Sequence, residues 1–426
     1  MQRGTGSFSL DNGSSPNFPL RSPRHGHECG VRKSRKIGQA PYSPQTDFER
    51  VFMKIESIVL RELSMSLINP FATSFGETRD RRVLLVEVRA DGLSGWGECT
   101  TGEHPYFSEE STDTAWITIL QELVPLLTAT EEQSGGKCPG IFRPVRGHRM
   151  AKAAIENALW DLEAQMRRIP LYELLGGVRE TIACGVSIGI QSSLEKLLGK
   201  VEEAVGQGYQ RIKLKCKPGL DVSMFEAVRH RWPEIVLSCD ANSAYRLRDS
   251  DHLTTFDQFN LLMIEQPLWA DDFYFHAMLQ QRLETAICLD ESIRNRRDAL
   301  AAIEMESCRI INVKLGRVGG FSEAIAIHNA TQERGIPVWC GGMLESGIGR
   351  SHNIALSTLE NFSLPGDVSA SRRYWAEDII EPEVTVSAAG EIRVPQTPGR
   401  GFEVRTGLIE RLTVRKEEIK AMALVS

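Results

Sequence analysis

Five charged residues recur at nearly constant spacing along the sequence. They are Lys215, Asp240, Glu265, Asp290 and Lys314, and the intervals between them are 25, 25, 25 and 24 residues. Each comes at the end of a short apolar run, and one strand–helix unit has about this length. We therefore expect the five side chains at equivalent positions on five successive strands, at the end where barrel enzymes place their catalytic groups.

The three carboxylates of this set, Asp240, Glu265 and Asp290, would converge from neighbouring strands. Anions brought together repel one another unless a cation lies among them. Because neither His nor Cys joins the set, the pattern predicts an all-oxygen site for Mg²⁺, with Mn²⁺ as a substitute. The alternative is a structural network of ion pairs with nearby lysine and arginine.

The two lysines of the set, Lys215 and Lys314, would lie four strands apart in an eight-membered ring and face each other across its mouth. A nearby divalent cation and a second lysine both favour the neutral amine, the form that a base needs. Lys213 alternates with Lys215 and points to the same face, and Arg317 follows Lys314 by three residues. Two opposed lysines around a metal suit removal of a proton beside a carboxylate, through an enediolate.

The elements that must position these residues form a repeating pattern. Eight apolar or β-branched runs alternate with helical stretches, at 181–188, 211–216, 236–242, 262–266, 286–291, 309–314, 337–341 and 364–369. The helical stretches include 195–207 and 323–334. Repeated strand–helix units indicate parallel strands with right-handed crossovers, which predicts a (β/α)8-type barrel. A doubly wound open sheet is the alternative, although its Gly-rich phosphate turn is missing.

A segment without strict alternation precedes the barrel. Strands are expected at 54–67 and 83–88, a turn at Asp91-Gly92, and helices at 109–127 and 149–168. This order is typical of an α+β domain. Residues 69–82, between the two strands, are expected to form either a mobile lid or an ordinary surface loop.

The first 52 residues differ in composition from the rest. They carry 8 basic and 4 acidic side chains, whereas the whole chain of 426 residues has a net charge of −6. They show no helical or strand periodicity, so we expect a disordered basic extension ahead of a start at Met53. The basic cluster at 32–36 could also serve as a targeting or nucleic-acid patch, but a solvated tail is the interpretation we favour.

The overall composition excludes several classes of protein. Hydrophobic residues make up 41% and charged residues 25%, the balance of a soluble globular protein. The acidic net charge argues against a dedicated nucleic-acid binder, and no apolar run is long enough to span a membrane. The nine cysteines are scattered without Cys-x-x-Cys pairs, which argues against disulfides or zinc and favours a cytoplasmic location.

The strand-end set resembles the Lys-x-Lys branch of the enolase superfamily, whose members use lysine bases with Mg²⁺. The short motifs that carry the resemblance are Lys213-Leu-Lys215, Asp240-Ala-Asn242, Glu265-Gln-Pro267 and Asp290-Glu291. Three longer strings, at 314–320, 341–350 and 364–369, resemble the o-succinylbenzoate synthase / N-succinylamino acid racemase group of that superfamily. The resemblance extends from Met53 to about residue 410.

This resemblance implies a fold and a reaction. The fold is a barrel, expected at 176–370, and a capping domain built from both ends of the ordered chain, expected at 53–175 and 371–426. The reaction is dehydration of 2-succinyl-6-hydroxy-2,4-cyclohexadiene-1-carboxylate to 2-succinylbenzoate in menaquinone biosynthesis, or racemisation of N-succinylamino acids. We expect a small carboxylate substrate, a homo-oligomer, and neither nucleic acid nor membrane as a partner.

The resemblance also implies roles for individual residues. Asp240, Glu265 and Asp290 match the Mg²⁺ ligands, Lys215 the acid/base lysine, and Lys314 the opposite lysine that stabilises charge or acts as a second base. Supporting or substrate-binding roles are expected for Lys213, Asn242, Arg317, Gly342, Met343 and Glu345. Residues 69–82 match the loop that closes over substrate.

Four alternative functions remain open at this point. A dedicated N-acylamino acid racemase shares the same site. Dipeptide epimerases and muconate cycloisomerases share the three carboxylates, but the Gly-Gly-Met-Leu-Glu sequence at 341–345 disfavours them. A non-catalytic barrel is disfavoured because all five charged residues are retained.

Overall fold

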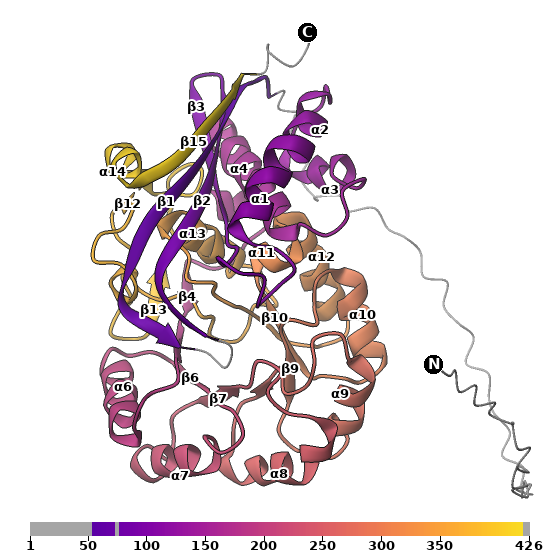
Figure 1. Cartoon of the computed structure of the whole chain (residues 1–426), viewed down its shortest axis with the longest axis vertical. Helices are drawn as coiled ribbons and strands as arrows, with labels where there is room; N and C mark the ends of the chain where they lie inside the picture. Colours follow the sequence, from indigo (N-terminus) through magenta and orange to yellow (C-terminus); the bar gives the residue numbers. More distant parts are fainter. Residues whose placement is uncertain (1–52, 73–75, 421–426) are drawn as a thin grey trace, which may run out of the picture. The chain divides into compact units, whose positions relative to one another are not determined.

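The computed structural model describes residues 53–72 and 76–420, so the predicted extension at 1–52 lies outside the described residues. An antiparallel sheet with its helices and a parallel sheet ringed by helices make up most of this part of the chain (Figure 1). Within it, no helix is long and apolar enough to cross a membrane.

The antiparallel sheet, called the cap sheet below, has the strand order β15-β1-β2-β3. Its strands are β1 (Ile55–Ala72), β2 (Glu77–Ala90), β3 (Leu93–Cys99) and β15 (Thr413–Lys420). Asp91 and Gly92 join β2 to β3 with φ of 50° and 73°, as expected for Asp-Gly in a two-residue hairpin turn. The predicted turn is confirmed. Because β15 pairs with β1, the sheet combines segments from both ends of the described chain.

Helix α4 (Arg149–Arg167) packs directly against β3. A Cβ atom on Gly95 or Gly97 would overlap carbonyl oxygens of α4, so the two glycines permit the close approach of strand and helix. Ile155, Leu159 and Leu162 are fully buried on the inner face of α4. The helix predicted at 149–168 and its apolar face are thus confirmed.

The helix predicted at 109–127 is present but divided. It consists of α1 (Thr112–Thr118), a π-helical turn η1 (Ile119–Leu123) and α2 (Val124–Thr128), followed by the short α3 (Cys138–Ile141). Pro125 lies in the first turn of α2, where its missing N–H breaks the regular hydrogen-bond pattern of the preceding turn. The π turn bridges this break.

The parallel sheet contains seven strands in the order β11-β10-β9-β8-β7-β6-β5. They are β5 (Gly185–Ile188), β6 (Arg211–Lys215), β7 (Leu237–Asp240), β8 (Ile264–Glu265), β9 (Ile287–Leu289), β10 (Ile310–Val313) and β11 (Val338–Cys340). The predicted strand at 181–188 is split, because β4 (Thr181–Ala183) pairs with β13 (Glu391–Arg393) instead. Seven of the eight predicted runs therefore supply the parallel sheet.

The eighth predicted strand, at 364–369, is wrong, since these residues form no strand. Pro365 has no N–H to donate, which prevents a regular ladder there. The segment still bridges the two edges of the parallel sheet, through isolated pairs between Val338 and Phe362 and between Cys184 and Gly366. An irregular segment thus takes the place of the expected strand.

Helices follow the parallel strands and surround the sheet (Figure 1). They are α6 (Leu194–Gly206), α7 (Val222–Arg231), α8 (Ser250–Thr254), α9 (Phe273–Gln280), α10 (Arg296–Glu304), α11 (Leu315–Val318), α12 (Phe321–Gln332) and α13 (Gly347–Leu356). The helices expected at 195–207 and 323–334 are confirmed to within two residues. After the barrel come β12 (Ile380–Glu381), β14 (Glu403–Val404) and α14 (Thr406–Leu412).

The segment predicted as a lid or surface loop, 69–82, is mostly strand. β1 extends to Ala72 and β2 begins at Glu77, and the two pair up to that level. The expectation of an irregular loop is therefore wrong for the described part of this segment. Long paired strands project it from the cap sheet instead.

Candidate active site

The five regularly spaced charged residues lie together at the carboxyl ends of the parallel strands. Lys215, Asp240 and Glu265 are the last residues of β6, β7 and β8, and Asp290 and Lys314 directly follow β9 and β10. Lys215 pairs in register with Asp240, and Asp240 with Glu265. Residues at the same level of neighbouring parallel strands therefore recur about every 25 residues in the sequence.

The three carboxylates are buried, and each accepts a hydrogen bond from a different lysine. The pairs are Asp240–Lys215 at 2.6 Å, Glu265–Lys213 at 2.7 Å and Asp290–Lys314 at 2.8 Å. Burial would raise the pKa of Asp240, but the ammonium groups of Lys215 and Lys213 hold it below its usual value. The mouth of the barrel is therefore a charged centre made of alternating anions and cations.

Lys213 has three carboxylate neighbours. Its Nζ lies 2.7 Å from Glu265 Oε2, 2.7 Å from Asp367 Oδ2 and 3.5 Å from Asp240 Oδ2. Burial opposes the charge of this amine, but the three carboxylates raise its pKa above the ordinary value. Lys213 is thus a fixed ammonium that holds carboxylates in place.

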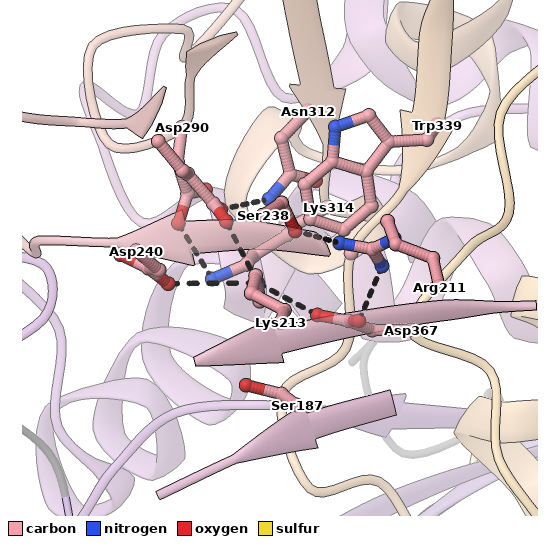
Figure 2. Close-up of polar contacts among 12 residues, drawn as sticks. Ser187, Arg211, Lys213, Ser238, Asp240, Asp290, Asn312, Lys314, Trp339 and Asp367 are labelled. Carbon is pink, nitrogen blue, oxygen red and sulfur yellow. Dashed lines mark hydrogen bonds and ion pairs between the residues drawn. The ribbon is translucent and has the colours of Figure 1, made fainter. Parts of the chain in front are cut away.

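Asp367, Arg211 and Trp339 extend this cluster into the barrel and were not predicted (Figure 2). Asp367 Oδ1 lies 2.5 Å from Arg211 Nη2, and the Arg211 guanidinium lies 4.3 Å from the centroid of the Trp339 ring. Burial raises the pKa of Asp367 while Lys213 and Arg211 lower it, to about 2. Asp367 falls within the 364–369 run, two runs after the one that ends at Lys314, so extending the search for charged residues to the last predicted run would have found it.

Asn242 connects two charged groups of the site. It accepts a hydrogen bond of 2.6 Å from Lys215 Nζ and donates one of 2.9 Å to Glu291 Oε1. Its φ of 42° is in the left-handed region, which asparagine tolerates better than most residues. Burial and the charge of Asp240 raise the pKa of Glu291.

Arg317 lies behind the site rather than in its wall. Its guanidinium contacts Asp290 and donates to the carbonyl oxygens of Ile293 at 2.7 Å and Asn312 at 2.5 Å. The Asn312 side chain in turn donates to Glu265 Oε1 at 2.7 Å. Burial lowers the pKa of Arg317 to about 9. Arg317 thus supports Asp290 directly and Glu265 through Asn312, and it does not line the cavity.

A cavity of about 430 Å³ opens above these side chains, between the cap and the strand ends. On the barrel side, Lys215, Asn242, Lys314 and residues 342–344 line it. Gly342 and Met343, both predicted, are therefore in the wall. A Cβ on Gly342 would meet the Asp367 carbonyl oxygen at 2.8 Å, so glycine permits the close approach of this loop.

Glu345, also predicted, is buried beside the cavity and does not line it. Its Oε1 accepts a hydrogen bond of 2.9 Å from Asn353 Nδ2, and its carbonyl oxygen accepts one of 3.0 Å from Trp375 Nε1. These bonds fix the loop that carries Gly342 and Met343. The structure thus gives Glu345 a supporting place.

The cap closes the other side of the cavity with Phe71, residues 76–82 and part of the loop 102–107. Arg81 donates to the carbonyl oxygen of Met343 at 3.4 Å, and the Phe107 ring lies over Lys314 Nζ. These contacts join segments more than 200 residues apart, and no local pattern in the sequence predicts them.

The donor chemistry of the strand ends fits a divalent cation. Asp240, Glu265 and Asp290 are buried carboxylates on adjacent strands, and such oxygens are what Mg²⁺ prefers. Within residues 53–72 and 76–420, no group of three or more His, Cys, Asp or Glu side chains is assembled as a ready-made metal site. Lysine amines make the contacts with these carboxylates instead, so a bound cation would replace some of them.

Comparison with known families agrees with this geometry. Residues 54–176 match the mandelate racemase / muconate lactonizing enzyme N-terminal domain, and residues 196–408 match the family described as enolase C-terminal domain-like. The chain belongs to the enolase superfamily. The resemblance inferred from the strand-end motifs is confirmed, and enzymes of this superfamily use a divalent metal, usually Mg²⁺.

Individual relatives within the enolase superfamily narrow the comparison. The chain is 52% identical over 362 residues to an o-succinylbenzoate synthase from Geobacillus kaustophilus. The match covers 85% of this chain and 96% of the relative. The chain is 43% identical over 365 residues to an N-succinylamino acid racemase from Amycolatopsis sp, and this match covers 85% and 99%. This superfamily member is thus an enzyme with close homologues of both names.

A solved structure of an enolase superfamily member from Listeria innocua has the same fold. It matches with a TM-score of 0.84 and 41% identity, and the match covers 87% of this chain and all of that one. The similarity confirms the superfamily fold, with its parallel sheet and separate antiparallel cap.

Proposed function

We propose that this chain is a Mg²⁺-dependent o-succinylbenzoate synthase. It converts 2-succinyl-6-hydroxy-2,4-cyclohexadiene-1-carboxylate into 2-succinylbenzoate for menaquinone biosynthesis, with N-succinylamino acid racemisation as a second activity. The observation that carries the proposal is that Lys215 and Lys314 line one cavity from different strands while each contacts a different carboxylate. The relatives named for the two reactions support it.

In the dehydration, Lys215 handles both proton transfers. Its neutral amine takes the proton next to the substrate carboxylate, and the electron pair of that C–H bond enters the enediolate. The resulting ammonium then gives a proton to the departing hydroxyl, which leaves as water. One lysine suffices because the proton and the hydroxyl leave from the same side. The ammonium of Lys314 stabilises the negative charge from the other side.

In the racemisation, a lysine is needed on each face of the substrate. One amine takes the proton from one face, and the ammonium of the other lysine returns a proton to the opposite face. Lys215 is held by Asp240 and Asn242, and Lys314 by Asp290. Different partners on different strands suit two amines that act from two sides.

Asp240, Glu265 and Asp290 are proposed to hold the Mg²⁺ ion, with Mn²⁺ as a substitute. When bound, this cation supplies positive charge for a substrate carboxylate and for the enediolate. Lys213 and Arg317 keep the carboxylates in place. Asn242, Gly342 and Met343 line the space for the substrate, and Glu345 supports the loop that carries two of them.

We also propose domain boundaries, an oligomeric state and a cellular location for this enzyme. Residues 176–370 form a closed barrel in which 361–367 replaces a regular eighth strand, and residues 53–175 with 371–426 form the capping domain. Residues 1–52 are a dispensable extension. The substrate is a small carboxylate, the enzyme is a cytoplasmic homo-oligomer, and it has neither nucleic acid nor membrane as a partner.

The test is to assay the purified chain with both substrates in the presence of Mg²⁺, with Lys215→Ala as the inactive control. We expect formation of 2-succinylbenzoate together with interconversion of N-succinylamino acid enantiomers. Racemisation without dehydration would identify a dedicated racemase. Absence of both reactions would overturn the proposal in favour of a different superfamily activity.

A further inference from the structure

Phe107 of the cap lies over the amine of Lys314. The Lys314 Nζ is 4.3 Å from the ring centroid, well within the roughly 6 Å at which an aromatic face attracts a cation. We propose that Phe107 is a positioning residue for Lys314, which it holds by this cation–π contact, and that it thereby tunes the part of the reaction that depends on Lys314 and leaves the part of Lys215 unchanged. The inference rests on the proposed function, because that function assigns separate tasks to the two lysines.

The Lys314 amine is held between a ring and a carboxylate. Below it, Asp290 Oδ2 accepts its hydrogen bond at 2.8 Å. Asp290 also contacts the guanidinium of Arg317, so its negative charge is shared between two cations. The ring of Phe107 supplies attraction from the cavity side, where both residues line the wall.

Lys215 is held in a different way. Its Nζ lies 2.6 Å from Asp240 Oδ2 and 2.6 Å from Asn242 Oδ1, and both partners belong to the barrel. Its position therefore depends on polar groups of neighbouring strand ends. A change in the electron density of the Phe107 ring should reach Lys314 and leave Lys215 as it is.

Phe107 is itself anchored in the cap. It is partly buried and packs against the apolar core that the cap sheet forms with α4. The contact with Lys314 thus connects the cap core to the end of β10. The Lys314 amine therefore has one neighbour from the cap, Phe107, and one from the barrel, Asp290.

The ring contact fixes the position of the Lys314 ammonium in both reactions. When the neutral amine of Lys314 takes a proton from a substrate carbon, the C–H bond breaks, an N–H bond forms and the amine becomes an ammonium. The Phe107 ring, 4.3 Å away, then holds this ammonium at the position from which it returns a proton to the substrate. When Lys314 instead stabilises the enediolate during dehydration, it is an ammonium throughout, and the ring holds it in place.

The test lowers the electron density of the Phe107 ring face and keeps the size of the ring nearly constant. Phe107 is replaced by 4-fluoro-, 3,5-difluoro- and 3,4,5-trifluorophenylalanine, and α-proton exchange with D₂O is measured for each enantiomer of an N-succinylamino acid. The enantiomer that still exchanges in Lys215→Ala reports on Lys314. We expect its exchange to fall stepwise, by roughly 2- to 30-fold in total, while exchange of the other enantiomer stays nearly constant. Phe107→Tyr should retain the wild-type ratio of the exchange rates of the two enantiomers. Phe107→Leu should lower this ratio as much as 3,4,5-trifluorophenylalanine does.

Equal loss for both enantiomers, or no trend with fluorination, would overturn the inference. If the wild type exchanges neither enantiomer, the racemase part of the proposed function is wrong, and the dehydration then provides the readout. In that case kcat should fall along the fluorinated series with KM unchanged, and a constant kcat would contradict the role of Phe107.

A measurement without turnover separates the contact from the proposed function. In the full chain with ¹³C-labelled lysine Cε, the Lys314 signal, assigned with Lys314→Arg, should show an upfield ring-current shift that disappears in Phe107→Leu. Loss of this shift in an enzyme that catalyses neither reaction would disprove the function and retain the contact. An unchanged signal would disprove the contact itself.

Discussion

The carboxylate of Glu156, on cap helix α4, accepts a hydrogen bond of 2.6 Å from the backbone N–H of Ser322 in barrel helix α12. Burial raises the pKa of Glu156 from its ordinary 4.5 to about 8, although the bonds from Ser322 oppose the shift. The native protein therefore keeps this proton to higher pH than the unfolded chain. Stability from this group is complete below pH 4.5 and is lost as the pH rises toward about 8.

Glu156→Gln should remove this part of the pH dependence. The amide keeps an oxygen that can accept from Ser322, so stability near pH 5 should resemble the wild type. At pH 9 the variant should be more stable, by an amount on the order of 1 kcal/mol or more, because each pKa unit corresponds to about 1.4 kcal/mol. Urea unfolding at pH 5, 7 and 9 measures the difference. The exposed Glu122→Gln serves as the control, and parallel stability curves for wild type and Glu156→Gln would contradict the prediction.

Gly97→Ala should strongly destabilise the cap. The added Cβ would overlap the Ala154 carbonyl oxygen of α4, so strand and helix must separate, at a cost of about 1–3 kcal/mol. Gly199→Ala is the matched control, since its Cβ would meet nothing within 4 Å on the exposed side of α6. This second change should stabilise by up to about 1 kcal/mol. Thermal unfolding distinguishes them, and a Tm for Gly97→Ala equal to the wild type would show that β3 and α4 are not so closely packed.

Asp240→Asn, Glu265→Gln and Asp290→Asn should each reduce activity by about 100-fold or more, because a bound metal ion contributes several kcal/mol to catalysis. Treatment with EDTA should have the same effect on the wild type. Added Mg²⁺ should restore the chelated wild type and leave the variants inactive. The exposed Asp271→Asn should behave as wild type throughout. Full activity in metal-free buffer would refute the metal assignment.

Lys215 and Lys314 should contribute differently to the two reactions. Lys215→Ala should abolish dehydration and racemisation. Lys314→Ala should abolish racemisation and slow dehydration by about 100-fold or more, if its charge acts as an oxyanion-hole donor does. In D₂O each single variant should exchange the α-proton of one enantiomer only. Exchange of both enantiomers by either variant would show that the amines do not act from opposite faces.

Deletion of residues 1–52 should leave Tm and turnover unchanged. The reason is the compositional break at Met53, where a basic, aperiodic stretch gives way to the strand pattern that leads into β1. Thermal unfolding and the dehydration assay on both forms of the chain provide the test. A drop of several degrees in the truncated form would show that the extension contributes to the folded domain.

The strand-end set could be predicted because its spacing is a direct product of the fold. Each parallel strand needs a crossover of similar length, so residues at one level of the sheet recur at one interval in the sequence. Lys215, Asp240 and Glu265 lie at that level in register. The hairpin turn at Asp91-Gly92 was predictable for a local reason, since two residues with positive φ are needed there.

The contacts between cap and barrel could not be predicted in the same way. Phe107 and Lys314 are brought together only when two large units pack, and no period in the sequence connects them. The eighth predicted strand is wrong for a local reason, because Pro365 has no N–H to donate to a ladder, and the segment pairs through isolated bridges such as Gly366 with Cys184. Asp367 lies in that run and was not predicted as a site residue, although it binds Lys213 as closely as Glu265 does.

The pairing of β1 with β15 sets the order in which the enzyme can be completed during synthesis. Ser57 lies opposite Lys420 in this ladder, so β15 joins the cap sheet only after the whole barrel has left the ribosome, whereas β1, β2 and β3 can pair with one another much earlier. The barrel strands can find their neighbours as each crossover emerges, whereas the pairing of β1 with β15 must close a loop of several hundred residues. The cap sheet is therefore completed after the parallel sheet, although the cap residues that line the cavity, Phe71, 76–82 and part of 102–107, are all synthesised before it.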